Sequence, residues 1–110
     1  MIRPLAALLI LSGCVAAPAS QPDAPSRFSL VPAPGGLDVA GSGGREIGFG
    51  RDRDGVLQSV ARVEGRAPRP VACGGGRDAF AASDDLTLVF EGRRFVGWSG
   101  AAGAAGRTCA

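Results

Sequence analysis

The sequence predicts an α+β fold: one or two helices packed on a small antiparallel sheet that ends in a β-hairpin, the whole stapled by a disulfide. Three observations support this prediction. Apolar residues recur at helical spacing over residues 56–63, apolar and polar residues alternate over residues 86–99, and Cys73 and Cys109 are available to pair. Residues 27–110 are long enough to form one such domain.

The first part of the domain is expected to form three short strands. Within residues 28–31, 37–39 and 47–49, apolar side chains recur two positions apart. The first strand is expected to end at Pro32, because proline cannot donate a hydrogen bond to a sheet. A glycine-rich loop at residues 41–44 separates the second strand from the third.

A helix is expected to begin after Asp52 and to end at Gly65. Asp52 is a suitable N-cap, and Asp54 places a carboxylate in the first turn, where the helix dipole favours it. Gly65 followed by Pro68 is a typical stop signal. The apolar stripe of this helix consists of Val56, Leu57, Val60, Ala61 and Val63. For residues 71–83 the sequence does not decide between a second helix and a strand.

The predicted hairpin spans residues 86–99, with residues 91–92 as its two-residue turn. This register places Leu88 opposite Phe95, so that one face of the hairpin is apolar. The other face is expected to carry Val89, Val96 and Trp98. Trp98 is either a second-layer core residue or an exposed anchor, and its size favours the core.

The chain has three cysteines, at positions 14, 73 and 109. If Cys14 carries a modification that prevents it from forming a disulfide, Cys73 and Cys109 remain as the pair for an intrachain disulfide. The bridge would close a loop of about 36 residues, which the chain-entropy model values at roughly 3.5–4 kcal/mol. It would also hold the Gly/Ala-rich segment 100–106. No metal site is expected, because two cysteines without any histidine are too few ligands.

The composition argues against an enzyme. The chain contains no lysine, histidine or tyrosine, which excludes His-based triads, Schiff-base lysines and the P-loop lysine. We therefore expect no catalytic residue and no cofactor. The remaining enzymatic alternative is a mechanism that uses only carboxylates such as Asp84 or Glu91. Twelve arginines are nearly balanced by ten carboxylates, so no nucleic-acid partner is expected.

Several charged segments are expected to have structural roles. Residues 50–55, Gly-Arg-Asp-Arg-Asp-Gly, have part of a calcium-loop spacing. An EF-hand would place its first and twelfth positions on Gly50 and Ala61, which offer no side-chain oxygen. Arg93 and Arg94 are expected at a solvated strand edge. A sparse basic rim near the helix end is expected from Arg62, Arg66 and Arg69.

The N-terminus has the features of a bacterial lipoprotein signal. Arg3 precedes an apolar run at residues 4–11, far shorter than the roughly 20 residues of a transmembrane helix. Residues 11–14, Leu-Ser-Gly-Cys, resemble the lipobox of bacterial envelope lipoproteins. The resemblance implies that residues 1–13 are removed as a signal peptide and that Cys14 carries acyl chains such as palmitate. The protein would then be anchored to the membrane without spanning it.

Residues 14–26 are rich in proline and alanine and are expected to form a tether. At ~3.1 Å per residue in extended geometry, this tether could hold the domain up to about 40 Å from the membrane. The lipoprotein resemblance also implies a destination. Aspartate after the lipidated cysteine would indicate retention in the inner membrane, so Val15 favours the outer membrane, on the side facing the periplasm.

Two segments of the domain resemble those of known envelope proteins. Residues 50–56, with Gly65 and Pro68, are similar to the helix motif of the SmpA/OmlA (BamE-type) lipoproteins and, more remotely, of the β-lactamase inhibitor protein. Residues 86–98 resemble the closing hairpin of small secreted or lipidated bacterial proteins. The resemblance implies an α+β layer and transfers no functional residue to this chain.

The anchor, the tether and the lack of a catalytic constellation lead to a functional hypothesis. We expect a lipid-anchored cell-envelope protein that serves as a non-enzymatic binding or scaffold module. Its expected partners are the membrane, through the anchor, and another envelope protein. The alternative is an inhibitor of an envelope or secreted hydrolase that uses an exposed loop at residues 72–79, braced by Cys73 and Cys109.

Overall fold

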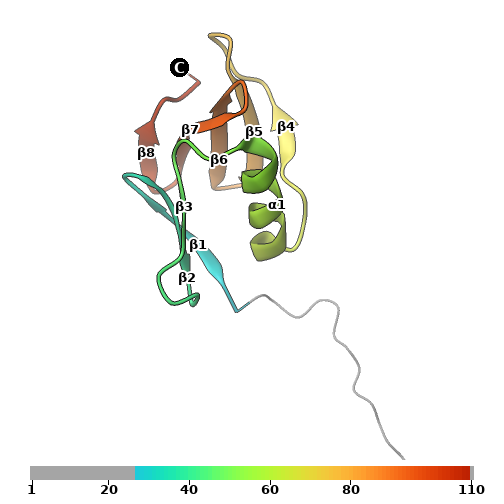
Figure 1. The fold of residues 1–110 in the computed structure, drawn as a ribbon. Helices are drawn as coiled ribbons and strands as arrows, with labels where there is room; N and C mark the ends of the chain where they lie inside the picture. The colour runs from blue at the N-terminus through green and yellow to red at the C-terminus, as the bar shows by residue number, and fades with distance from the viewer. Residues whose placement is uncertain (1–26, 110) are drawn as a thin grey trace, which may run out of the picture.

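The structure, a computed structural model, describes residues 27–109, and these fold mainly into antiparallel strands (Figure 1). Three strands come first, a helix follows, and five strands complete the domain. The elements are β1 (Ser29–Ala33), β2 (Gly36–Ala40), β3 (Glu46–Gly48), α1 (Arg53–Glu64), β4 (Arg69–Val71), β5 (Asp78–Ser83), β6 (Leu86–Glu91), β7 (Arg94–Gly100) and β8 (Gly103–Gly106).

The first three strands form a sheet of their own, in the order β1-β2-β3. Leu37 of β2 pairs with Ile47 of β3, and both side chains are buried in the core. The three strands expected from the alternating pattern are therefore confirmed. β1 continues through Pro32 to Ala33, and proline is tolerated there because β1 is an edge strand.

Helix α1 has the caps that the sequence predicts. The Asp52 carboxylate accepts a hydrogen bond from the Asp54 N–H at 3.0 Å. At the other end Gly65 adopts a left-handed conformation with φ of 82°, and its N–H donates to the Ala61 carbonyl. Buried Val56 and Val60 attach the helix to the core, and α1 contacts strands of both sheets.

The other five strands form a second sheet in the order β4-β5-β6-β7-β8, with every neighbouring pair antiparallel. Residues 71–83, for which the sequence allows either a helix or a strand, contain the end of β4 and all of β5. Their small, irregularly spaced side chains give little periodicity to recognise. Backbone pairing with β6 nevertheless makes this segment a strand.

The β6–β7 hairpin is confirmed, but its register differs from the predicted one. Glu91 pairs with Arg94, so residues 92–93 form the turn and the predicted turn at residues 91–92 is wrong. Gly92 has a φ of 59°, the left-handed conformation that such a turn requires. The predicted register is therefore one residue out at the turn.

A β-bulge decides which hairpin side chains reach the core. The register shifts between Val89 and Phe90, which places Phe90 opposite Phe95 and Leu88 opposite Trp98. One extra residue in β7 turns Phe95 and Trp98 toward the same face. The expected pairing of Leu88 with Phe95 is wrong, and so is the placement of Trp98 on the opposite face. Trp98 lies in the main core with 4 % of its surface exposed.

The two sheets are joined through β7. Residues 49–52, which link β3 to α1, run beside the start of that strand. The Gly50 N–H donates to the Phe95 carbonyl at 2.7 Å, and the Phe95 N–H donates to the Arg51 carbonyl at 3.0 Å. The Trp98 indole N–H donates to the Ala33 carbonyl at the end of β1, also at 2.7 Å. The outer edge of β7 is therefore shared between this linker and β8.

The tail that follows β8, residues 107–109, lies close against β7. The Arg107 N–H donates to the Val96 carbonyl at 2.8 Å. A Cβ atom added to Gly97 would collide with the backbone of Arg107. Only glycine permits this approach without a shift of the backbone.

From β7 the tail runs to the β4–β5 loop, two strands further along the sheet, where Cys109 bonds to Cys73. Val89, in the intervening strand β6, pairs with Gly97 of β7 and with Ala79 of β5. Val89 and Ala79 are buried but do not belong to the main core cluster. The tail therefore covers a second, smaller set of apolar side chains on the outer face of the sheet.

The predicted fold class is wrong. An α+β layer of one or two helices on one small sheet was expected, whereas the described chain is mostly β, with one 12-residue helix and two antiparallel sheets of three and five strands. The sequence pattern did not show β4 or β8 and left β5 undecided. β4 has only three residues, one of them proline, whereas β5 is half alanine and β8 consists of glycine and alanine. The predicted disulfide between Cys73 and Cys109 is confirmed.

Replacing Gly97 by alanine should lower the free energy of unfolding by about 1–3 kcal/mol, because the new methyl group overpacks the contact with the tail. Urea unfolding measures this difference. Gly55→Ala is the control: Gly55 lies in α1 with no atom within 4 Å of an added Cβ, so this change should be neutral or stabilising by about 0.5–1 kcal/mol. Equal stability of Gly97→Ala and the wild type would contradict the packing described for the tail.

Candidate functional site

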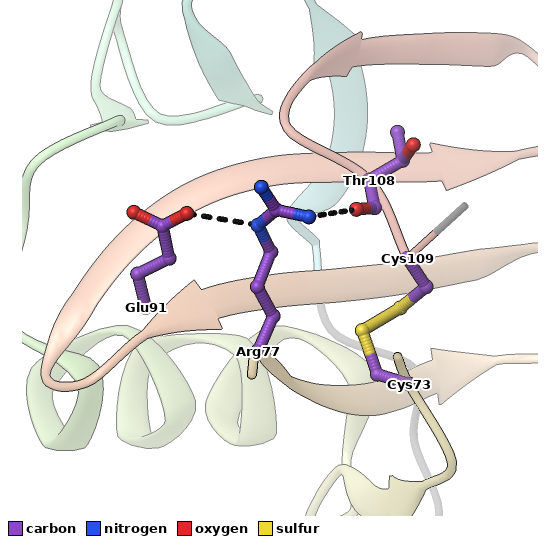
Figure 2. Close-up of a disulfide and its surroundings, with 5 residues drawn as sticks. All are labelled: Cys73, Arg77, Glu91, Thr108 and Cys109. Atoms are coloured by element: carbon purple, nitrogen blue, oxygen red, sulfur yellow. Dashed lines mark hydrogen bonds and ion pairs between the residues drawn. A yellow bond between two sulfur atoms is a disulfide. The ribbon is translucent and has the colours of Figure 1, made fainter. Parts of the chain in front are cut away.

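The first candidate site is the braced end of the domain, which comprises the β4–β5 loop and the C-terminal tail. The Cα atoms of Cys73 and Cys109 are 4.9 Å apart, and their disulfide joins the two segments (Figure 2). The three glycines of the loop, Gly74, Gly75 and Gly76, are exposed. The loop lies at the same end of the domain as the C-terminus, far from the end at which the chain enters β1 (Figure 1).

Arg77 holds the two segments together a second time. Its Nε donates to a carboxylate oxygen of Glu91 at 2.8 Å, and its Nη1 donates to the Thr108 carbonyl at 3.1 Å (Figure 2). Arg107 approaches the same Glu91 oxygen at 3.4 Å. The hydrogen bond from Arg77, followed by the charges of Arg107 and Arg77, lowers the pKa of Glu91 below its ordinary value of 4.5. Glu91 is therefore ionised at neutral pH and serves as an ion-pair partner.

A separate ion-pair cluster lies at the start of α1. Arg93, in the hairpin turn, donates to Asp52 at 3.0 and 3.2 Å and to Asp54 at 3.0 Å. The hydrogen bond from Arg93 is the main cause of a lowered pKa at Asp52, and the two carboxylates raise the pKa of Arg93. Arg93 was expected only as a solvated edge residue. Arg93 is about 40 residues from Asp52 and Asp54 in the sequence, so no local pattern indicated that they would form ion pairs.

The second candidate site is a groove of about 470 Å³ between α1 and the β2–β3 loop, called here the arginine groove. Its apolar lining consists of Phe28, Val39, Ile47 and Val63. Its cationic lining consists of Arg45, Arg51 and Arg62, and Glu46 is the one carboxylate among the lining residues. The groove therefore combines an apolar surface with an excess of positive charge.

Each arginine of the groove is positioned by a different element. Arg45 ends a tight loop, in which its N–H donates to Ser42 Oγ at 3.1 Å. Arg51 belongs to the linker that pairs with β7, and Arg62 lies in the last turn of α1. No guanidinium of the three forms an ion pair within residues 27–109. These cations are therefore available to an external anion.

The structure brings together only part of the predicted basic rim. Arg62 lines the arginine groove, whereas Arg66 and Arg69 line a different depression beside β5. Sequence reasoning missed Arg45 and Arg51, because they line the same groove as Arg62 only after the β2–β3 loop and the β3–α1 linker have packed beside the helix. The predicted disulfide residues are joined as expected. The lipidation site, Cys14, lies outside the described residues.

The described chain has two further properties that bear on its chemistry. Between residues 27 and 109, no three His, Cys, Asp or Glu side chains lie close enough together to hold a metal ion. No helix in that range is long and apolar enough to cross a bilayer.

Comparisons with family models, with curated proteins and with solved structures found no match to this chain.

The lowered pKa of Glu91 predicts a specific acid sensitivity. Because ionised Glu91 is favoured in the folded state, its contribution is present above the unfolded pKa and is lost as pH falls through the folded pKa. The stability of the wild type should therefore fall below about pH 4.5. Glu91→Gln should be less stable at neutral pH and show a shallower acid decline, measured by thermal unfolding across pH.

Glu46→Gln is the matched control for this prediction, because Glu46 is exposed and forms no ion pair within the described range. Its acid profile should follow that of the wild type. If Glu91→Gln kept the full wild-type decline, Glu91 would not be the ion-pair partner assigned to it.

Proposed function

We propose that this protein is a lipid-anchored component of the bacterial cell envelope whose domain acts as a non-enzymatic binding or scaffold module. The lipobox-like Leu-Ser-Gly-Cys at residues 11–14 supports the anchor. The observation that carries the binding role is the braced end: a disulfide and the Arg77 hydrogen bonds hold a loop and the tail in one surface. That surface lies at the end opposite to the chain entry (Figure 1).

A braced surface suits binding for an energetic reason. Ordering a flexible loop on association costs free energy for each immobilised residue, and a preformed surface avoids most of that cost. The Gly-Gly-Gly segment at residues 74–76 would be highly mobile without constraint. Here Cys73 fixes it on one side and Arg77 fixes it on the other. The braced end therefore offers exposed backbone groups to a partner at low entropic cost.

The electrostatics favour binding over catalysis. A carboxylate that acts as a general acid needs a raised pKa, whereas the pKa values of Asp52 and Glu91 are lowered by their arginine partners. The carboxylate-only mechanism through Glu91 is disfavoured for this reason. We place the domain in the periplasm, attached to the outer membrane, with an envelope protein as its partner.

Cys14→Ser should abolish acylation and move the protein from the membrane fraction to the soluble fraction of the envelope. Metabolic labelling with a palmitate analogue and membrane fractionation measure both effects. Cys73→Ser with Cys109→Ser is the control, since it should keep the label. Label that persisted in Cys14→Ser would rule out this cysteine as the anchor.

Photo-crosslinking in living cells tests the binding role. A photoreactive amino acid at Gly74 in the braced loop should capture an envelope protein, and the same amino acid at exposed Asp84 in the β5–β6 turn should not. Reduction of Cys73–Cys109 should lower the yield at Gly74. Equal capture at both positions would show that the braced end has no binding specificity.

The exposed, doubly fixed loop also favours a second candidate, an inhibitor of an envelope or secreted hydrolase. Inhibitory loops act as rigid inserts, and residues 74–76 are held between Cys73 and Arg77. The purified protein would be assayed against a panel of a protease, a lysozyme and a β-lactamase. Inhibition that disappears when the disulfide is reduced would support this function. If no enzyme of the panel were inhibited, the inhibitor function would be ruled out.

A further inference from the structure

The arginine groove has a definite place in the domain. Phe28, immediately before β1, is one of its lining residues, so the groove lies where the chain enters the described domain. The β2–β3 loop, which carries Arg45, extends toward this same end, whereas the C-terminus lies at the other (Figure 1). If the chain is anchored at Cys14, the groove lies at the end of the domain to which the tether is attached (Figure 1).

The charge of the groove remains uncompensated because neighbouring carboxylates are already occupied. Asp52 follows Arg51 directly, but Asp52 and Asp54 both bind Arg93. Glu46 is the one acidic lining residue, against three arginines. The groove therefore has a net positive charge, and its cations project into solvent, where they can meet an anion.

The shape and chemistry of the groove match a phospholipid headgroup region. Guanidinium groups bind phosphate through parallel hydrogen bonds. In the same groove lining, Phe28 is 43 % exposed, and Val39 and Val63 are partly buried. An aromatic ring beside cations is the arrangement expected of a surface that lies at a membrane interface.

We propose that the arginine groove docks on the anionic phospholipid surface of the membrane that carries the lipid anchor. Arg45, Arg51 and Arg62 bind lipid phosphates, and Phe28 contacts the glycerol and upper acyl region. This inference rests on the proposed anchor, which keeps the groove near the bilayer at a high effective concentration. An acidic protein is disfavoured as the occupant, because the groove faces the anchored end of the domain. Docking leaves the braced end directed away from the membrane.

The test uses the full chain, purified from membranes and reconstituted into vesicles. A photoreactive phenylalanine analogue replaces Phe28 in the groove or, as a control, Ala72 at the braced end. One set of vesicles contains phosphatidylcholine alone, and the other contains equal parts of phosphatidylcholine and phosphatidylglycerol. Lipid crosslinking from position 28 should increase in the anionic vesicles and decrease at high salt, whereas position 72 should give little in either.

Arg45→Gln with Arg62→Gln should lower the docking equilibrium about fivefold per arginine removed, following the value of about 1 kcal/mol for each arginine near an anionic surface. Arg66→Gln with Arg69→Gln removes the same charge outside the groove and should have little effect. Glu46→Gln should increase docking. Both groove arginines are exposed and form no ion pair in the described chain, so thermal unfolding should show an intact fold.

Equal lipid crosslinking in the two kinds of vesicle, or equal effects of the two arginine pairs, would overturn the proposal. Capture of a protein but no lipid from position 28 in native membranes would overturn it too, in favour of an acidic partner. Mass spectrometry of Cys14 distinguishes failure of the lipid anchor from failure of the docking. An unmodified Cys14 refutes the anchor, whereas an acylated Cys14 without anionic-lipid dependence refutes only the docking.

Discussion

The covalent link between Cys73 and Cys109 is the constraint on which the organisation of this domain depends. Within the five-stranded sheet, β5 is half alanine and β8 consists only of glycine and alanine, so β8 contributes almost no apolar surface of its own. The disulfide fixes the tail after β8 to the opposite side of the sheet, which buries Val89 and places Thr108 within reach of Arg77. A weak strand thus becomes part of a covalently closed unit.

The molecule has two different ends, and the disulfide braces one of them. At the disulfide end, covalent and ionic bonds fix a glycine loop and the tail, a surface suited to recognition. At the entry end, arginines without ion pairs in residues 27–109 surround an apolar groove. Helix α1 lines the groove, and the carboxylates at its start, Asp52 and Asp54, are neutralised by Arg93 from the hairpin turn. In the proposed arrangement one end rests on the membrane and the other faces a partner.

Local signals in the sequence were reliable and long-range ones were not. The caps at Asp52 and Gly65, the alternating strands and the cysteine pair all depend on near neighbours or on simple counting, and the structure confirms them. The predicted hairpin register was wrong by one residue at the turn, and a bulge that no residue pattern marks shifted it again between Val89 and Phe90. The prediction of the fold class was wrong because strands such as β8 form by backbone pairing and have no apolar pattern that the sequence would reveal. The groove could not be predicted, since Arg45, Arg51 and Arg62 meet only after the helix packs.

Urea unfolding of the Cys73→Ser, Cys109→Ser variant beside the wild type is the most direct test of the central role of the disulfide. The account predicts that the variant loses roughly 3.5–4 kcal/mol of unfolding free energy, the value expected for a loop of this length. That loss is a large share of the roughly 5–15 kcal/mol of a typical domain. A variant as stable as the wild type would contradict the account, because the tail and β8 would then be held without the bridge.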